Sequence, residues 1–184
     1  SFNTRALESG DAEEFYAETM IALASEDILF VSSAGNESLN VDSADAEGKV
    51  NLPTILDSPI LVSVAATTNT HNLASSFSNY GYLTVETSAP GAGVTLASKT
   101  GNASYGVGNG TSFASPYVAG IAAYAWAMNP TLTAEEIRNV LTKTSYLSDL
   151  IGIQYYWVPV IAQSIVRPDL FAEPATNERK SGFA

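Results

Sequence analysis

The sequence has no cysteine and only one histidine, His71, among its 184 residues. Without cysteine the chain has no disulfides, zinc–thiolate sites, iron–sulfur clusters or thiol nucleophile. A single histidine also excludes a metal site built mainly from imidazole ligands. The redox compartment stays open, because many secreted proteins also lack disulfides.

Basic residues are scarce, with 8 lysines and arginines against 19 aspartates and glutamates and a formal net charge of −11. Because like charges repel, we expect neither nucleic acid nor a membrane as a partner. No apolar run approaches the ~18 residues of a transmembrane helix. No basic and apolar leader stands at the start, so we expect that any signal peptide has been removed. With 46% apolar residues, the chain can bury a core of its own.

Two short apolar runs, 28–32 and 60–66, are typical of strands buried on both faces of a parallel sheet. Weaker strand signals lie at 75–78, 84–88 and 94–97. The alternation of these strands with helical segments indicates a layered α/β domain. We expect this domain to occupy residues 1–165, followed by a C-terminal tail at 166–184.

Three segments have helical patterns. Asp11 with Glu14, and Thr133 with Glu136, form pairs typical of helix N-termini and predict amphipathic helices to about Ser25 and Thr144. Residues 112–128 are rich in alanine and apolar nearly all round, which indicates a helix inside the protein.

Ser112 stands where a glycine-rich stretch, 106–110, meets the start of that apolar helix. A hydroxyl there is presented at a helix N-terminus, whose free N–H groups and dipole can stabilise a developing oxyanion. We expect the glycines of 106–110 to form a flexible loop that leads to Ser112. Serine or threonine before an apolar run is more often a helix cap, and spacing alone favours the cap.

Several segments, however, resemble the subtilisin-like serine proteases. Residues 109–120, NGTSFASPYVAG, are similar to the family's nucleophile signature GTSxAxPxVAG, and VSSAGN at 31–36 resembles the strand and turn that carry its oxyanion asparagine. Further similar segments follow in the family's order, namely LVSVAA at 61–66, SSFSNYG at 75–81 and SAPG at 88–91. Five ordered matches within residues 28–145 are far more specific than one motif.

The resemblance implies a three-layer α/β fold, with a mostly parallel sheet between helices, and endopeptidase activity through an acyl-enzyme. It implies that Ser112 is the nucleophile and that the Asn36 side chain and the Ser112 N–H bind the oxyanion; an ordinary turn residue is the alternative for Asn36. Asn3 stands where the family usually has glycine. The resemblance also implies substrate-binding edges, formed by Ser1, Phe2, Asn3, Ser33, Ala34 and Gly35.

The family's other catalytic residues have no counterpart here. Subtilisin-like enzymes carry an aspartate and then a histidine upstream of the oxyanion asparagine, and the serine needs both. His71 follows Asn36 and precedes Asn72-Leu73 where the family has Gly-Thr, so we assign it no catalytic role. The chain therefore resembles the C-terminal part of the catalytic domain, with the N-terminal strands absent.

Three explanations stay open: two associated chains cut from one precursor, an incomplete copy of the protein, or a catalytically inactive relic that binds or assembles. The intact Gly110-Thr111-Ser112 and Asn36 favour activity. We expect a protein or peptide substrate, and as partner the N-terminal part of the same domain, carrying the histidine and aspartate. That partner should bury the apolar faces of the strands at 28–32 and 60–66.

Asp42, Asp45 and Glu47 lie in the polar loop after Asn36, where calcium is possible by resemblance to the family. A solvated acidic loop explains them more simply, so we assign no metal ligand. The resemblance also places the pocket floor near 52–54 and implies a secreted or extracytoplasmic protein. The negative charge predicts a preference for neutral or basic peptides.

Overall fold

The fold is that of a computed structural model, which describes residues 4–6, 10–43, 50–70, 72–98, 101, 104–143, 145–147 and 154–156. The helices among them are α1 (Gly10–Ser25), α2 (Thr111–Met128) and α3 (Ala134–Lys143). The strands are β1 (Thr4–Ala6), β2 (Phe30–Ser33), β3 (Val50–Leu52), β4 (Leu61–Thr67), β5 (Thr87–Pro90), β6 (Val94–Ala97), β7 (Tyr105–Gly108), β8 (Ser145–Leu147) and β9 (Gln154–Tyr156). Within this part of the chain, no helix is long and apolar enough to cross a membrane.

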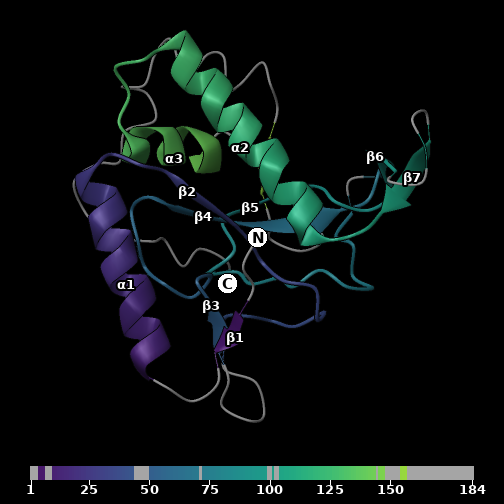
Figure 1. Ribbon diagram of the computed structural model, residues 1–184, viewed down its shortest axis with the longest axis horizontal. Helices are drawn as coiled ribbons and strands as arrows, with labels where there is room; N and C mark the ends of the chain where they lie inside the picture. Colours follow the sequence, from purple (N-terminus) through teal and green to yellow (C-terminus); the bar gives the residue numbers. More distant parts are fainter. Residues whose placement is uncertain are drawn as a thin grey trace.

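The centre of the fold is a five-stranded sheet in the order β2-β4-β5-β9-β8. Figure 1 labels β2, β4 and β5 of this sheet. The pairings β2–β4, β4–β5 and β5–β9 are parallel, and β8 pairs antiparallel to β9. Two small antiparallel ribbons, β1–β3 and β6–β7, stand apart from this sheet. The predicted α/β class with a mostly parallel sheet is confirmed.

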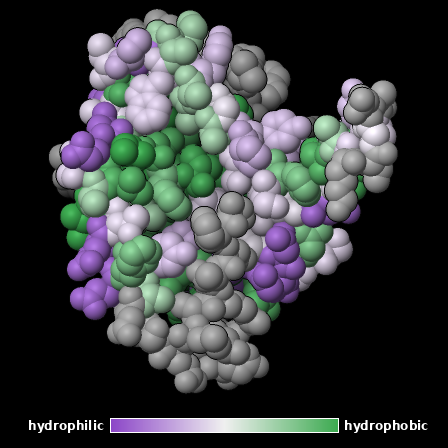
Figure 2. Space-filling view, in the orientation of Figure 1, coloured by the Kyte–Doolittle hydropathy of each residue, from purple (hydrophilic) through white to green (hydrophobic). Residues whose placement is uncertain are grey.

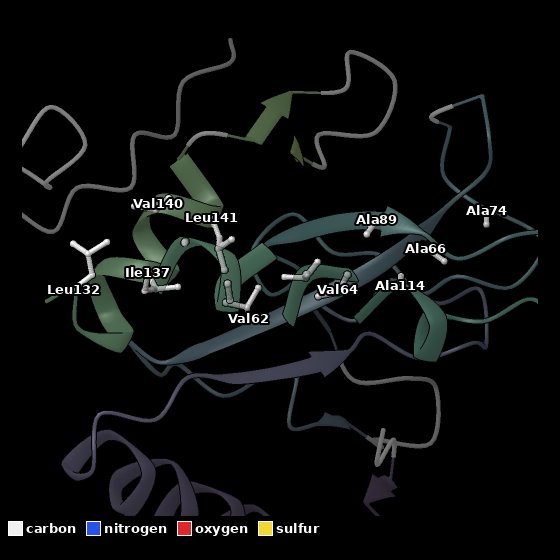
Figure 3. Packing of buried hydrophobic residues seen from close by; sticks show 13 residues of the cluster. Val62, Val64, Ala66, Ala74, Ala89, Ala114, Leu132, Ile137, Val140 and Leu141 are labelled. Atoms are coloured by element: carbon white, nitrogen blue, oxygen red, sulfur yellow. The ribbon is translucent and has the colours of Figure 1, made fainter. Parts of the chain in front are cut away.

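Strand β4 organises the core, because all seven of its residues are buried. Val62, Val64 and Ala66 pack in one cluster with side chains of α2 and α3, as Figure 3 shows. Leu61 and Ala65 alternate with these residues along β4. Leu61 packs in a second cluster with Met20 of α1, and Ala65 belongs to a third cluster. The sheet therefore lies between helices, as expected.

The expectation that the 60–66 strand needs a partner chain to bury it is wrong, because this chain's own elements cover β4 on both faces. Strand β2 differs, since it lies at the edge of the sheet and Phe30 and Val31 are only half-buried. Ile28, just before β2, is 46% exposed. Hydrophobic side chains accordingly reach the surface over β2, between α1 and α2 (Figure 2).

Two helices are less buried than the sequence predicted. In α2 the buried residues lie on one face, and Tyr117, Tyr124 and Met128 are 49%, 54% and 56% exposed. In α1, which begins at Gly10 and so includes Asp11 in its first turn, Phe15 and Ile21 are 64% and 70% exposed. Both helices thus have apolar side chains on their outer surface.

The glycine-rich stretch 106–110 is not a loop throughout, because β7 pairs with β6 in register, Gly108 opposite Val94. The predicted strand at 75–78 is also absent: the N–H groups of Phe77 and Ser78 both donate to the Ala74 carbonyl in a turn. The predicted 84–88 strand begins three residues later, at Thr87 of β5, and ends at Pro90.

The predicted N-terminus of α3 is confirmed by reciprocal hydrogen bonds. The Glu136 carboxylate accepts from the Thr133 N–H at 2.8 Å, and the Thr133 hydroxyl accepts from the Glu136 N–H at 3.2 Å. This pairing satisfies N–H groups that the helix itself leaves without acceptors.

An ion pair joins α3 to the sheet. Arg138 donates from Nη2 to the Glu86 carboxylate at 3.3 Å and from Nε to the Leu61 carbonyl at 2.8 Å. Glu86 also accepts from the Ser63 N–H at 2.6 Å. Burial raises the pKa of Glu86, although Arg138 and the N–H groups act in the opposite direction.

Replacing Glu86 by glutamine is expected to remove a pH-dependent part of the free energy of unfolding. Because the folded-state pKa lies above the ordinary value of 4.5, the folded protein binds this proton more tightly than the unfolded chain does. The stabilisation that Glu86 gains from this tighter proton binding is complete when the pH is below 4.5, and it declines as the pH rises through the folded-state pKa.

The free energy of unfolding of the parent protein minus that of Glu86→Gln should therefore fall with rising pH in denaturant titrations between about pH 4 and pH 8. Arg138 stays charged throughout this range. The loss of its partner in Glu86→Gln therefore does not itself vary with pH and does not change the slope of this difference against pH. A difference that grows with pH would show that attraction to Arg138 outweighs burial.

Candidate active site

The start of α2 is held firmly against the end of β5. The Gly110 N–H donates to the Gly91 carbonyl at 2.8 Å. A Cβ on Gly91 would lie 2.6 Å from the Ala66 Cβ and 2.7 Å from the Gly110 carbonyl oxygen, so only glycine fits there. Ser112, the second residue of α2, is consequently presented at a fixed place, with its side chain exposed.

Pro116 is the sixth residue of α2 and lies beyond its first turn. Because proline has no N–H, the Ser112 carbonyl loses its usual partner four residues on. The Ser112 N–H is itself in the first turn, where the helix supplies no acceptor. That N–H is therefore available to an external oxygen.

Asn36 reaches the start of α2 from the end of β2. Gly35, with a φ of 103°, makes the turn that brings it there, a conformation that favours glycine. Asn36 Oδ1 accepts from the Thr111 N–H at 2.8 Å and from the Thr111 hydroxyl at 3.0 Å. The Thr111 Oγ1 in turn accepts from the Gly35 N–H at 3.1 Å.

This bonding settles which way the Asn36 amide points. A backbone N–H can only donate, so the atom facing Thr111 must be the amide oxygen. The Nδ2 group therefore points away from Thr111, and it has no hydrogen-bond partner among the described residues. A Cβ on Gly110 would lie 3.1 Å from Ser112 Oγ and 3.7 Å from Asn36 Oδ1, so the two side chains converge beside this glycine.

The structure thus brings Asn36 and Ser112 together, the two residues predicted as catalytic. Of the predicted substrate-binding residues, Ser33, Ala34 and Gly35 are buried at the end of β2, where the Ala34 N–H donates to the Val64 carbonyl at 2.9 Å. Ser1, Phe2 and Asn3 lie outside the described residues. The substrate-binding assignment stays a prediction.

Thr111 has a role that sequence reasoning missed, because threonine before an apolar run is typical of a helix cap. It is fully buried and makes no side-chain cap for α2, since all of its described side-chain bonds reach the Gly35–Asn36 turn. The family signature contains this threonine directly before Ser112, and this position in the signature is the sequence feature that indicates a role for it.

No general base contacts Ser112 within the described part of the chain, where no histidine or carboxylate is hydrogen-bonded to it. His71, together with Asp45, Glu47 and the predicted tail at 166–184, lies outside that part. The sequence expectation that base and carboxylate come from elsewhere is untested.

The Asp42 carboxylate does not fit a calcium site. It accepts from the N–H groups of Tyr82, Leu83 and Thr84 at 2.6, 3.0 and 3.0 Å, and from the Thr84 hydroxyl at 2.9 Å. These donors occupy the oxygens that a cation would need. Across the described ranges, no cluster of three or more histidine or acidic residues is arranged for a metal.

Comparison with known proteins identifies the family, because the subtilase family matches residues 3–181. The chain belongs to the subtilase family. Subtilisin DY from Bacillus licheniformis is 37% identical over 118 residues, which are 64% of this chain and 39% of that protein. An extracellular protease from Xanthomonas campestris is 38% identical over 121 residues, 62% of this chain and 19% of the relative.

Solved structures show the same fold. A lanthipeptide protease superposes with a TM-score of 0.71 at 24% identity, over 90% of this chain and 58% of that one. A prenylagaramide maturation protease gives a TM-score of 0.69 at 19% identity, over 89% and 59%. The subtilase chain described here thus spans less than two thirds of the length of each of these relatives.

Replacing Thr111 by valine, which keeps the shape but removes Oγ1, is expected to lower the free energy of unfolding by about 1–3 kcal/mol. The buried Gly35 N–H would lose its acceptor, and Asn36 Oδ1 would lose one of two donors. Thr111→Ser retains the hydroxyl and serves as the matched control in denaturant titrations. Equal stability of the two variants would show that the hydroxyl does not hold the turn.

Proposed function

We propose that this chain is the nucleophile-bearing part of a serine endopeptidase that hydrolyses peptide bonds through an acyl-enzyme at Ser112. The observation that carries the proposal is the Asn36–Thr111 bond pair. It turns the Asn36 Nδ2 group away from Thr111, as a donor without a partner among the described residues, beside the exposed Ser112 hydroxyl. The family membership supports the same chemistry.

The proposed reaction follows from the positions of these groups. Ser112 Oγ attacks the peptide carbonyl, whose oxygen gains negative charge as the tetrahedral intermediate forms. The Asn36 Nδ2 and Ser112 N–H groups donate to this oxygen, and the positive end of the α2 dipole adds to the stabilisation. Both donors are held in place before the reaction, so little reorganisation is required.

A base must accept the serine proton, since an unassisted hydroxyl is a poor nucleophile at neutral pH. We propose that a histidine and an orienting aspartate come from polypeptide outside residues 1–184, the N-terminal part of the same catalytic domain. The exposed apolar side chains of α2 and the open edge of β2 support contact with such a segment.

The proposed substrates are proteins or peptides, and the proposed location is secreted or extracytoplasmic, in keeping with the extracellular relative. The net charge of −11 supports a preference for neutral or basic peptides through long-range attraction. We also propose that the protein binds calcium, with ligands other than Asp42.

A fluorophosphonate probe tests the chemistry in the natively purified assembly. We expect covalent labelling at Ser112, detected by peptide mass spectrometry, and no labelling in Ser112→Ala. Ser115→Ala is the matched control, because it removes another serine from the same helix and should keep the label. An unlabelled Ser112 in the complete assembly would reject the enzyme and favour an inactive binding or assembly module.

The oxyanion role of Asn36 is tested by Asn36→Asp. Aspartate keeps an oxygen that accepts from Thr111 but replaces the Nδ2 donor by a second acceptor. We expect kcat for a peptide substrate to fall by about 10²–10³-fold with KM nearly unchanged. An unchanged melting temperature confirms that the fold persists; unchanged kcat would remove Asn36 from the mechanism.

A further inference from the structure

The turn that carries Asn36 is bound by a second asparagine, Asn79, which is completely buried. Asn79 Oδ1 accepts from the N–H groups of Glu37 at 3.0 Å and Leu39 at 2.9 Å. Its Nδ2 group donates to the Ala34 carbonyl at 2.9 Å and to the Glu37 carboxylate at 2.7 Å. The Asn79 N–H also donates to the Gly35 carbonyl at 2.9 Å.

These contacts use the full capacity of the Asn79 amide, which has two N–H donors and an oxygen with two lone pairs. They reach backbone groups on both sides of Asn36. Asn36 itself is bonded through its side chain to Thr111. Asn79 therefore determines the path of the backbone through the turn, whereas Thr111 determines the rotation of the Asn36 amide.

Asn79 can act in this way because its own segment is tied to the sheet. The Ser78 hydroxyl accepts from the Ala66 N–H of β4 at 2.9 Å and donates to the Asn79 carbonyl at 2.9 Å. On either side of Asn79, Phe77 accepts from the Ser38 N–H and Tyr80 donates to the Leu39 carbonyl. Through these hydrogen bonds, the turn that carries Asn36 is held in place by the core strand β4.

The turn also needs an external constraint. Ser38 has a φ of 57°, a left-handed conformation that non-glycine residues adopt at a cost. Such a conformation persists only where the surrounding bonds determine it, and Asn79 binds the residues immediately before and after Ser38. Without these bonds, the backbone would relax and carry Asn36 with it.

We propose that Asn79 is a positioning residue that sets the oxyanion donor of Asn36 in register with Ser112. This inference rests on the proposed endopeptidase function and assigns a role to a residue that touches neither substrate nor nucleophile. Preorganised donors stabilise a transition state only when they are aimed before the reaction starts. A shift of the turn should therefore lower kcat while leaving substrate binding nearly unchanged.

A double-mutant cycle in the complete active assembly tests the coupling. Asn79→Ala is expected to lower kcat per titrated active site by about tenfold or more, up to the roughly 10²–10³-fold loss caused by removing an oxyanion donor, at similar KM. In an Asn36→Asp background the same change should lower kcat by less than about twofold. Equal losses in the two backgrounds would overturn the proposal.

Two further comparisons keep the test decisive. Glu86→Gln, a change at the α3 ion pair and outside the turn, is the control for a substitution that breaks core hydrogen bonds, and it should leave kcat per active site unchanged. If Asn79→Ala does not fold, the isosteric Asn79→Asp replaces it. Aspartate loses both Nδ2 bonds, to the Ala34 carbonyl and the Glu37 carboxylate, and should still show the coupled loss of kcat.

Hydrogen exchange tests the geometry without relying on activity. The amides of Glu37 and Leu39 should exchange faster in Asn79→Ala than in the parent protein, and Glu86→Gln should not change them. Unchanged exchange would overturn the role of Asn79 even in an inactive protein. Absence of turnover in the parent protein would reject the proposed function alone.

Discussion

The hydrogen bonds from Thr111 to Asn36 Oδ1 join two segments that are 75 residues apart in the sequence. One segment ends an edge strand and the other begins the helix that presents Ser112. Because the donor N–H of Thr111 belongs to the residue before Ser112, the amide of Asn36 is oriented relative to the hydroxyl and not merely placed near it. A donor for negative charge follows from this single constraint, since the opposite amide group is left facing outward.

The sheet makes this constraint possible. In parallel strands the carboxyl ends meet at one edge of the sheet, and here Gly35 follows the end of β2, Thr67 ends β4 and Gly91 follows β5. The strand pairing places Ser33 opposite Val64 and Thr67 opposite Pro90. The position at which each turn leaves the sheet is therefore fixed by the neighbouring strand. The two glycines then allow a turn with positive φ and a backbone contact too close for a side chain.

Features that depend on local chemistry were predictable from the sequence, and features that depend on distant partners were not. The capping pair of Thr133 and Glu136 lies within four residues, and β4 is apolar or small throughout, so both followed from local patterns. Strand β7 contains two glycines, which disfavour strands, and it forms because β6 pairs with it. The turn at 74–78 replaces a predicted strand because Ser78 binds the Ala66 N–H. Asn36 and Ser112 were found through resemblance to a family, since spacing alone favoured a turn residue and a cap.

The incomplete burial of α2 bears on the same site. A helix of this composition is typical of one that is covered all round. The described chain covers only the face with Ala114, Val118 and Ala122, which packs on β4 and its neighbours. The opposite face, with Tyr117 and Tyr124, stays exposed, although β4 beneath the helix is completely buried. Among the described residues, the apolar surface without cover and the hydroxyl without a base therefore belong to one helix. The segment proposed above as the source of the histidine would, by packing on this outer face, bury the tyrosines and bring its proton acceptor to Ser112.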